Sequence, residues 1–165
     1  MALIMENVVG DYIIGDKKIS VIEYGNNTLV ELEVEDGISL DKAKWKFFCD
    51  NIENMKVAVK QYLIRGREGI YRLHLGKDIF VSVENGVMCV DIRKWFLPKN
   101  DVCLKPSRRG VALKICEFEE LFGTLSNINE DIPYCEGVIP CQYTHSESGV
   151  VEKCDHCLPS ASFKE

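Results

Sequence analysis

Apolar and polar residues alternate in two separate parts of the chain, and this pattern indicates β-strands. Residues 19–34 form two alternating stretches around the turn sequence Gly25-Asn26-Asn27. Residues 78–95 repeat the scheme around Asn85-Gly86, the dipeptide most typical of a tight hairpin. Both parts are therefore predicted to form antiparallel hairpins.

A helix is predicted after the strands in each part. Asp41 is a candidate N-cap, because its carboxylate can accept hydrogen bonds from the first helical amides. The first helix carries apolar residues at helical spacing and extends toward Tyr62; they are Trp45, Phe48, Ile52 and Met55. The second, shorter helix ends before Pro133 and carries Phe118, Leu121, Phe122 and Leu125.

The two parts match each other in a fixed order, which indicates an internal repeat. Gly37, Leu40 and Trp45 correspond at one constant offset to Gly110, Leu113 and Phe118. We expect an α+β protein with two tandem units, residues 8–66 and 67–130, each with strands followed by a helix. Residues 131–165 form a separate Cys/His-rich tail.

Charge is distributed unevenly along the 165 residues, whose formal net charge is -6. Residues 72–114 hold nine Lys/Arg and four Asp/Glu, a net charge of +5. Residues 11–53 hold ten acids and five lysines, a net charge of -5, and residues 115–165 hold ten acids and two lysines. The overall charge argues against nucleic-acid binding, but the charge of the middle segment does not.

The basic segment coincides with an insertion, residues 94–109, that the first unit lacks. It interleaves aromatic and basic side chains, namely Trp95, Phe96, Lys99, Lys105, Arg108 and Arg109. Single-stranded nucleic acid is bound by this combination, since cations neutralise phosphates and flat rings stack on unpaired bases.

The motifs of the second unit resemble a known family. Residues 90–95 read Val-Asp-Ile-Arg-Lys-Trp, residues 105–113 read Lys-Pro-Ser-Arg-Arg-Gly-Val-Ala-Leu, and Phe118 follows early in a helix. Over residues 71–129 the chain resembles the positive cofactor four family of single-stranded-DNA-binding transcriptional coactivators. Residues 11–62 resemble it more faintly. Ser107 stands where the family has glycine, which predicts a looser hairpin.

The resemblance implies a fold and a function. Each unit is expected to be a curved four-stranded sheet followed by a helix, and the units to pair as a pseudo-dimer within one chain; a homodimer of two chains is the alternative. The implied function is binding of single-stranded DNA with little sequence preference, as a coactivator-like factor in transcription or also in replication. Nuclear localisation, or a viral replication compartment, would follow.

The expected nucleic-acid contacts lie on the second unit. Trp95 is the stacking candidate, with a role in the core as the alternative, and His74 is expected to be structural. The predicted binding residues are Lys77, Arg93, Lys94, Trp95, Lys99, Lys105, Arg108 and Arg109. A different interpretation is a protein-interaction module that docks on transcription or replication machinery without binding nucleic acid.

The tail suggests zinc. Without a recognisable secretory signal, the eight cysteines indicate thiols or metal ligands rather than disulfides. The predicted tetrahedral set is Cys135, Cys141, Cys154 and Cys157, with His145 and His156 as alternates. Unliganded cysteines are the alternative. No membrane span is expected, and the absence of a phosphate loop or nucleophile motif argues against an enzyme.

Overall fold

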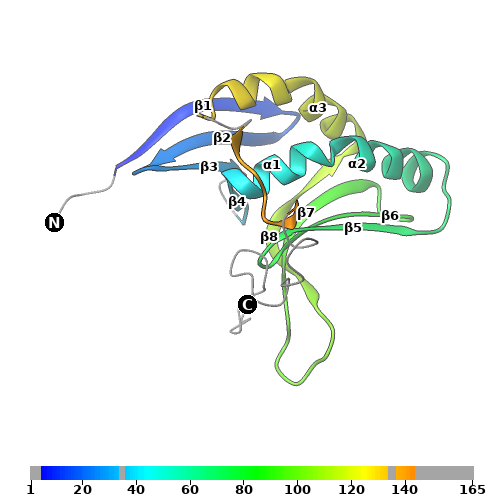
Figure 1. Cartoon of the computed structure of the whole chain (residues 1–165). Helices are drawn as coiled ribbons and strands as arrows, with labels where there is room; N and C mark the ends of the chain where they lie inside the picture. The colour runs from blue at the N-terminus through cyan, green and yellow to red at the C-terminus, as the bar shows by residue number, and fades with distance from the viewer. Residues whose placement is uncertain (1–4, 34–35, 134–136, 144–165) are drawn as a thin grey trace.

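The computed structural model describes residues 5–33, 36–133 and 137–143. It has two antiparallel four-stranded sheets, each with its strands in sequence order (Figure 1), which confirms the predicted α+β class. The first unit contains β1 (Glu6–Ile14), β2 (Lys17–Tyr24), β3 (Asn27–Leu32), β4 (Ile38–Asp41), α1 (Lys42–Asp50), α2 (Ile52–Ala58) and the π-helix η1 (Val59–Ile64). The second contains β5 (Ile70–Gly76), β6 (Ile79–Glu84), β7 (Cys89–Phe96), β8 (Lys105–Lys114) and α3 (Ile115–Glu130).

The helices lie where the sequence predicts, although the first is divided into three segments. Asp41 caps α1, since its Oδ1 accepts a hydrogen bond of 2.8 Å from the Lys44 amide. The segments α1, α2 and η1 follow one another to residue 64, and α3 ends at Glu130, before Pro133. Within the described residues, no helix has both the length and the apolar character needed to cross a membrane.

The two glycines that match in the sequence, Gly37 and Gly110, occupy similar places in the two sheets. Leu32 pairs with Ile38 in the first sheet, and Ile92 pairs with Val111 in the second. Gly37 precedes Ile38, and Gly110 precedes Val111. Each glycine lies close to the carbonyl oxygen of the residue that pairs with its successor: a Cβ on Gly37 would be 2.1 Å from Leu32 O, and a Cβ on Gly110 would be 2.6 Å from Ile92 O. Both units therefore need glycine at this place.

Helices α1 and α3 each contact the sheet of the other unit as well as their own. Helix α1 contacts β3 and β4 and continues onto β5, while α3 contacts β7 and β8 and continues onto β1. Figure 1 shows α3 above the first sheet and α1 to η1 above the second. The buried apolar side chains of both units form one cluster, so the two repeats share a single hydrophobic core.

Buried polar contacts also join the units. Glu117, only 3% exposed, lies in the first turn of α3. Its carboxylate accepts hydrogen bonds from the Asp16 amide at 3.3 Å and the Lys17 ammonium at 3.4 Å, both in the first unit. The Gly110 amide donates to the Asp36 carbonyl at 2.8 Å. These contacts hold the edge of the second sheet against the first unit.

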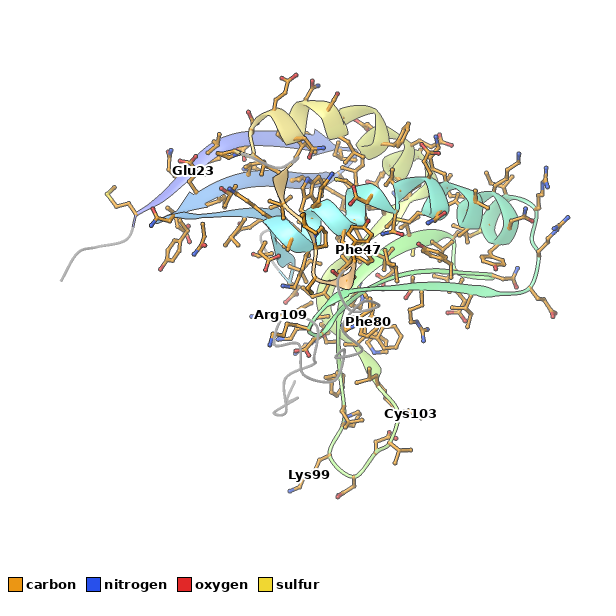
Figure 2. The ribbon with its side chains drawn as sticks, viewed as in Figure 1. Glu23, Phe47, Phe80, Lys99, Cys103 and Arg109 are labelled. Atoms are coloured by element: carbon orange, nitrogen blue, oxygen red, sulfur yellow. The ribbon has the colours of Figure 1, made fainter. Side chains whose placement is uncertain are left out.

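The insertion of the second unit forms a hairpin. β8 has ten residues, whereas the equivalent strand β4 has four. The β7–β8 connection projects away from the body of the molecule (Figure 1), and Figure 2 labels Lys99 and Cys103 near its end. The hairpin thus lies on the side remote from the helices.

The described part of the tail rests on both units. Gln142 Nε2 donates to the Leu75 carbonyl at 2.8 Å, and the Tyr143 hydroxyl donates to Asp50 at 2.9 Å. Cys141 is half-buried. The other predicted zinc ligands lie outside the described residues; they are Cys135, Cys154 and Cys157, with the alternates His145 and His156.

Candidate nucleic-acid interface

The second sheet presents two chemically different faces, because successive side chains of a strand point to opposite sides. Val81, Val83 and Ile92 are fully buried toward the helices. The intervening residues face away from the helices; they pair across the sheet as Arg72 with Ser82 and Asp91, and as His74 with Phe80 and Arg93. We call this side the outer face.

Aromatic rings gather on the outer face. His74 stacks on Phe80 with ring centroids 4.4 Å apart, and Phe80 meets Trp95 edge to face at 6.0 Å. The Arg72 guanidinium lies 4.5 Å above the Trp95 ring, a cation–π contact. Figure 2 places Phe80 near the base of the hairpin. Rings and a guanidinium are therefore adjacent on a sheet face that the helices do not cover.

Trp95 carries an unusual donor. Its Nε1 is buried and has no hydrogen-bond acceptor among the residues that the structure describes. A buried donor without a partner costs about 1–3 kcal/mol, so such groups are rare in folded proteins. The predicted stacking residue thus has a half-buried ring and an N–H for which the described residues provide no acceptor.

The base of the hairpin is tied by Ser107. The pairing of β7 with β8 shifts between Arg93 and Trp95. Across this irregularity, Ser107 Oγ donates to the Lys94 carbonyl at 2.7 Å and accepts from the Arg109 amide at 3.1 Å. The serine therefore adds hydrogen bonds that glycine cannot make, which differs from the looser hairpin expected from the sequence.

Arg93 is engaged within the chain. Its Nη2 lies 3.0 Å from the Asp91 carboxylate, and its Nη1 donates to the Ser107 carbonyl at 3.0 Å. These contacts favour a role in positioning the hairpin over the direct phosphate contact that the sequence predicted for this residue.

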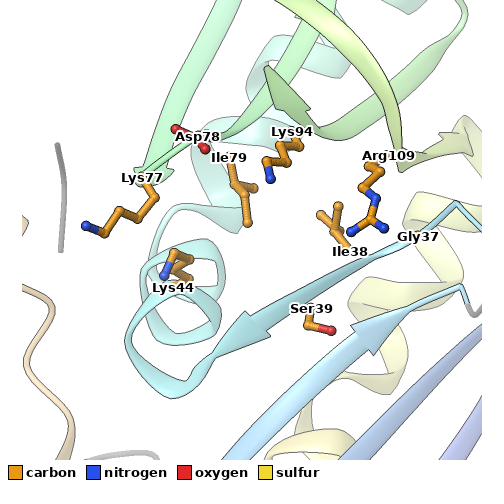
Figure 3. A pocket seen from close by; sticks show the side chains of 9 residues that line it. All are labelled: Gly37, Ile38, Ser39, Lys44, Lys77, Asp78, Ile79, Lys94 and Arg109. Atoms are coloured by element: carbon orange, nitrogen blue, oxygen red, sulfur yellow. The ribbon is translucent and has the colours of Figure 1, made fainter. Parts of the chain in front are cut away.

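A cationic pocket of about 320 Å³ lies between the two units. It is lined by segments of both, and Figure 3 shows Arg109 reaching from β8 toward Ile38 of β4. Its charged lining residues are Lys44, Lys77, Lys94, Arg109 and Asp78. We call it the inter-repeat pocket; it brings together three of the residues predicted to bind nucleic acid.

The charge in this pocket is mostly uncompensated. Lys44 pairs with Asp41 at 3.0 Å. Across residues 5–33, 36–133 and 137–143, no carboxylate lies within ion-pairing distance of Lys77, Lys94 or Arg109. Four cations therefore face one lining carboxylate, a setting that attracts anions. Arg109 also lines an adjoining pocket with Glu31, Glu33 and Asp36, so the lysines contribute most of this attraction.

The remaining predicted residues follow the hairpin. Lys99 is exposed, Arg108 is exposed on β8, and Lys105 pairs with Asp101 at 3.5 Å. Backbone amides of Cys103 and Val102 hold the pKa of Asp101 below its ordinary value. These three cations lie along the hairpin and do not line the inter-repeat pocket.

The first sheet has an acidic counterpart to the outer face. Arg72, Ser82 and Asp91 pair across neighbouring strands of the second sheet. The residues that pair in the same way across the first sheet are Asp11, Ser20 and Glu31. Ser20 Oγ donates to Asp11 at 2.6 Å. Burial, followed by the charge of Glu6, raises the pKa of Glu31. This acidic row is therefore unfavourable for an anion.

Four members of the two surfaces were not predicted from sequence. Arg72 and Phe80 reach the outer face by strand alternation, a signal that the sequence already holds, and His74 joins them through its pairing with Phe80. Lys44 comes from α1 of the other unit, so only tertiary packing brings it to the pocket.

No family model, curated protein or solved structure matches the chain. Among the described residues, no group of three metal-ligating side chains is present. Cys141, the described member of the predicted zinc set, lies 3.7 Å from Gln142 Oε1 through its Sγ.

Proposed function

We propose that the protein binds single-stranded nucleic acid across the outer face of the second sheet and the base of the β7–β8 hairpin. The observation that carries this proposal is the row of His74, Phe80 and Trp95 rings with Arg72 over Trp95. Stacking of a base on an aromatic ring contributes about 1–3 kcal/mol and does not depend strongly on base identity.

Cations beside the rings supply the second requirement. Lys77 and Lys94 line the pocket at the β5–β6 turn and the start of the hairpin, and Arg108 and Arg109 follow on β8. Contacts of this kind neutralise phosphates without reading sequence. The proposal therefore predicts binding that depends on salt and on single-strandedness, with little sequence preference.

The architecture supports a related inference about assembly. The two units have the same strand order, equivalent glycines and helices that each cover the sheet of the other unit. We infer an intramolecular pseudo-dimer in which the second unit carries the binding face. By resemblance to the positive cofactor four family, the setting we propose is transcription, with replication as a second possibility and a nuclear or viral compartment.

The test is fluorescence anisotropy with labelled oligonucleotides that carry hydroxyl ends. We expect tighter binding to single than to double strands, and Phe80→Ala to weaken it by roughly five- to a hundredfold. Phe122→Ala is the matched control, because Phe122 is an exposed ring on α3 under Lys56. Absence of single-strand binding at low salt would favour the protein-interaction module instead.

Zinc in the Cys/His-rich tail remains a proposal from the sequence. Thiolates and imidazoles would hold the ion tetrahedrally and stabilise a segment that has few apolar residues. Elemental analysis of the purified protein is expected to give bound zinc that Cys154→Ser/Cys157→Ser removes. A metal-free wild-type protein with an ordered tail would contradict the proposal.

A further inference from the structure

The inter-repeat pocket gathers cations from four separate elements. Lys44 comes from α1, Lys77 from the β5–β6 turn, Lys94 from β7 and Arg109 from β8. Like charges that line one cavity repel each other, which destabilises the fold unless an anion offsets the repulsion. The core does not require them, since its buried cluster is apolar.

Lys77 also occupies a strained backbone position. Its φ is +51°, in the left-handed region that glycine adopts most readily. The equivalent turn of the first unit, between β1 and β2, has Gly15 at φ +60°. The fold thus accommodates a glycine here, and the second unit instead places a lysine at a local cost of roughly 1–2 kcal/mol.

We propose that the inter-repeat pocket binds a phosphate monoester, the doubly charged group found at the end of a nucleic-acid strand and on a free mononucleotide. A monoester presents three acceptor oxygens and a charge of about -1.5 to -2 at neutral pH. The Arg109 guanidinium matches two of these oxygens as a fork, and lysine ammonium groups supply further donors. An internal phosphodiester has one charge, so it offsets less of the cluster.

Binding of matched ligands tests the proposal. The probes are one single-stranded oligonucleotide with a 5′-phosphate, a 3′-phosphate or hydroxyl ends, together with a mononucleotide. We expect a phosphate end or the mononucleotide to bind about tenfold more tightly than its unphosphorylated counterpart, the ratio supplied by one charge-assisted hydrogen bond. Preference for the strand end or for the mononucleotide identifies the source of the monoester.

Two variants connect the preference to the pocket. Lys94→Gln removes a charge, and Lys77→Gly removes both a charge and the left-handed lysine, so it is expected to fold at least as stably as the wild type. Both should abolish the preference for phosphate. Lys60→Gln, an exposed lysine on η1, is the matched control and should leave the preference unchanged. Equal affinity of the wild type for phosphorylated and unphosphorylated probes would overturn the proposal.

A second readout does not depend on nucleic acid. Inorganic phosphate should raise the melting temperature of the wild type more than chloride at equal ionic strength, because a ligand of the folded state stabilises it by mass action. Lys77→Gly should lose this difference. The same gain in both proteins would indicate a general salt effect and contradict the site.

The inference stands apart from base stacking on the outer face. Phe80→Ala should weaken the binding of oligonucleotides with hydroxyl ends but should keep the preference for a phosphorylated probe. Lys94→Gln should remove that preference in the wild-type background and in the Phe80→Ala background. If hydroxyl-ended strands fail to bind but the mononucleotide binds through Lys77 and Lys94, the proposed function fails and the pocket remains.

Discussion

Trp45 and Asn129 join the two repeats at the centre of the molecule. The indole Nε1 of Trp45, which is fully buried on α1, donates to Asn129 Oδ1 on α3 at 2.7 Å. Asn129→Ala should therefore lower the free energy of unfolding by about 1–3 kcal/mol, because it leaves a buried donor without an acceptor. Urea unfolding followed by tryptophan fluorescence measures the change.

The control for this prediction is Asn127→Ala, an exposed side chain on the same helix, with an expected change within about 0.5 kcal/mol. Because the units share one core, fluorescence and circular dichroism should report one transition in both variants. Equal stability of the two variants would show that the contact between the helices contributes nothing measurable.

Alkaline pH should destabilise the fold through Tyr12. Burial, assisted by the hydrogen bond to Asp131 and the charges of Asp131 and Glu130, raises the pKa of Tyr12 from 10.0 to about 12. The folded state therefore favours the protonated phenol, a contribution that is complete below pH 10 and is lost as pH rises toward 12.

Tyr12→Phe tests this dependence. The variant should be less stable near neutral pH, because it lacks the hydroxyl that donates to the Asn127 carbonyl at 3.0 Å. Its free energy of unfolding should fall less steeply between pH 10 and 12 than that of the wild type. Urea unfolding across this range, with tyrosinate absorbance, gives both quantities; parallel slopes would argue against a perturbed Tyr12.

Ser107→Gly should loosen the base of the hairpin. The change removes the Oγ bonds to the Lys94 carbonyl and from the Arg109 amide. We expect faster hydrogen exchange at the Arg109 amide and roughly two- to tenfold weaker binding of single strands. Ser107→Thr keeps the hydroxyl and should retain slow exchange; rapid exchange in the wild type would refute the prediction.

Removal of hairpin charge should change the salt dependence of binding. Arg108→Ala/Arg109→Ala is expected to weaken single-stranded DNA binding and to flatten the log–log salt dependence by about 0.7 per lost phosphate contact. Lys60→Ala/Arg65→Ala removes the same charge from η1 and its C-cap, remote from the hairpin in sequence, and should leave the slope unchanged. An unaltered slope in the hairpin variant would exclude these arginines from the interface.

The repeat and its elements were accessible from sequence for a local reason. Alternation in residues 19–34 and 78–95, the Asp41 cap and the paired glycines Gly37 and Gly110 all depend on neighbours close along the chain or on a simple comparison of two segments. The strands within these segments and the Asp41 cap are confirmed, and the two glycines lie at similar places in the two sheets. Trp95 was likewise correctly placed on β7, but its contact with Arg72 crosses the sheet and was not foreseen.

What the tertiary structure decided is which distant side chains meet. Charge in the sequence drew attention to Lys77, Lys94 and Arg109, yet Lys44 joins them only because α1 runs onto the sheet of the second unit. Arg93 has the same charge as Arg109, but the nearby Asp91 and Ser107 engage its guanidinium. Local patterns determined the two sheets and their helices, because backbone geometry responds to nearby residues. The pocket between the repeats depends on how those elements pack, because packing brings together side chains that are far apart in the sequence.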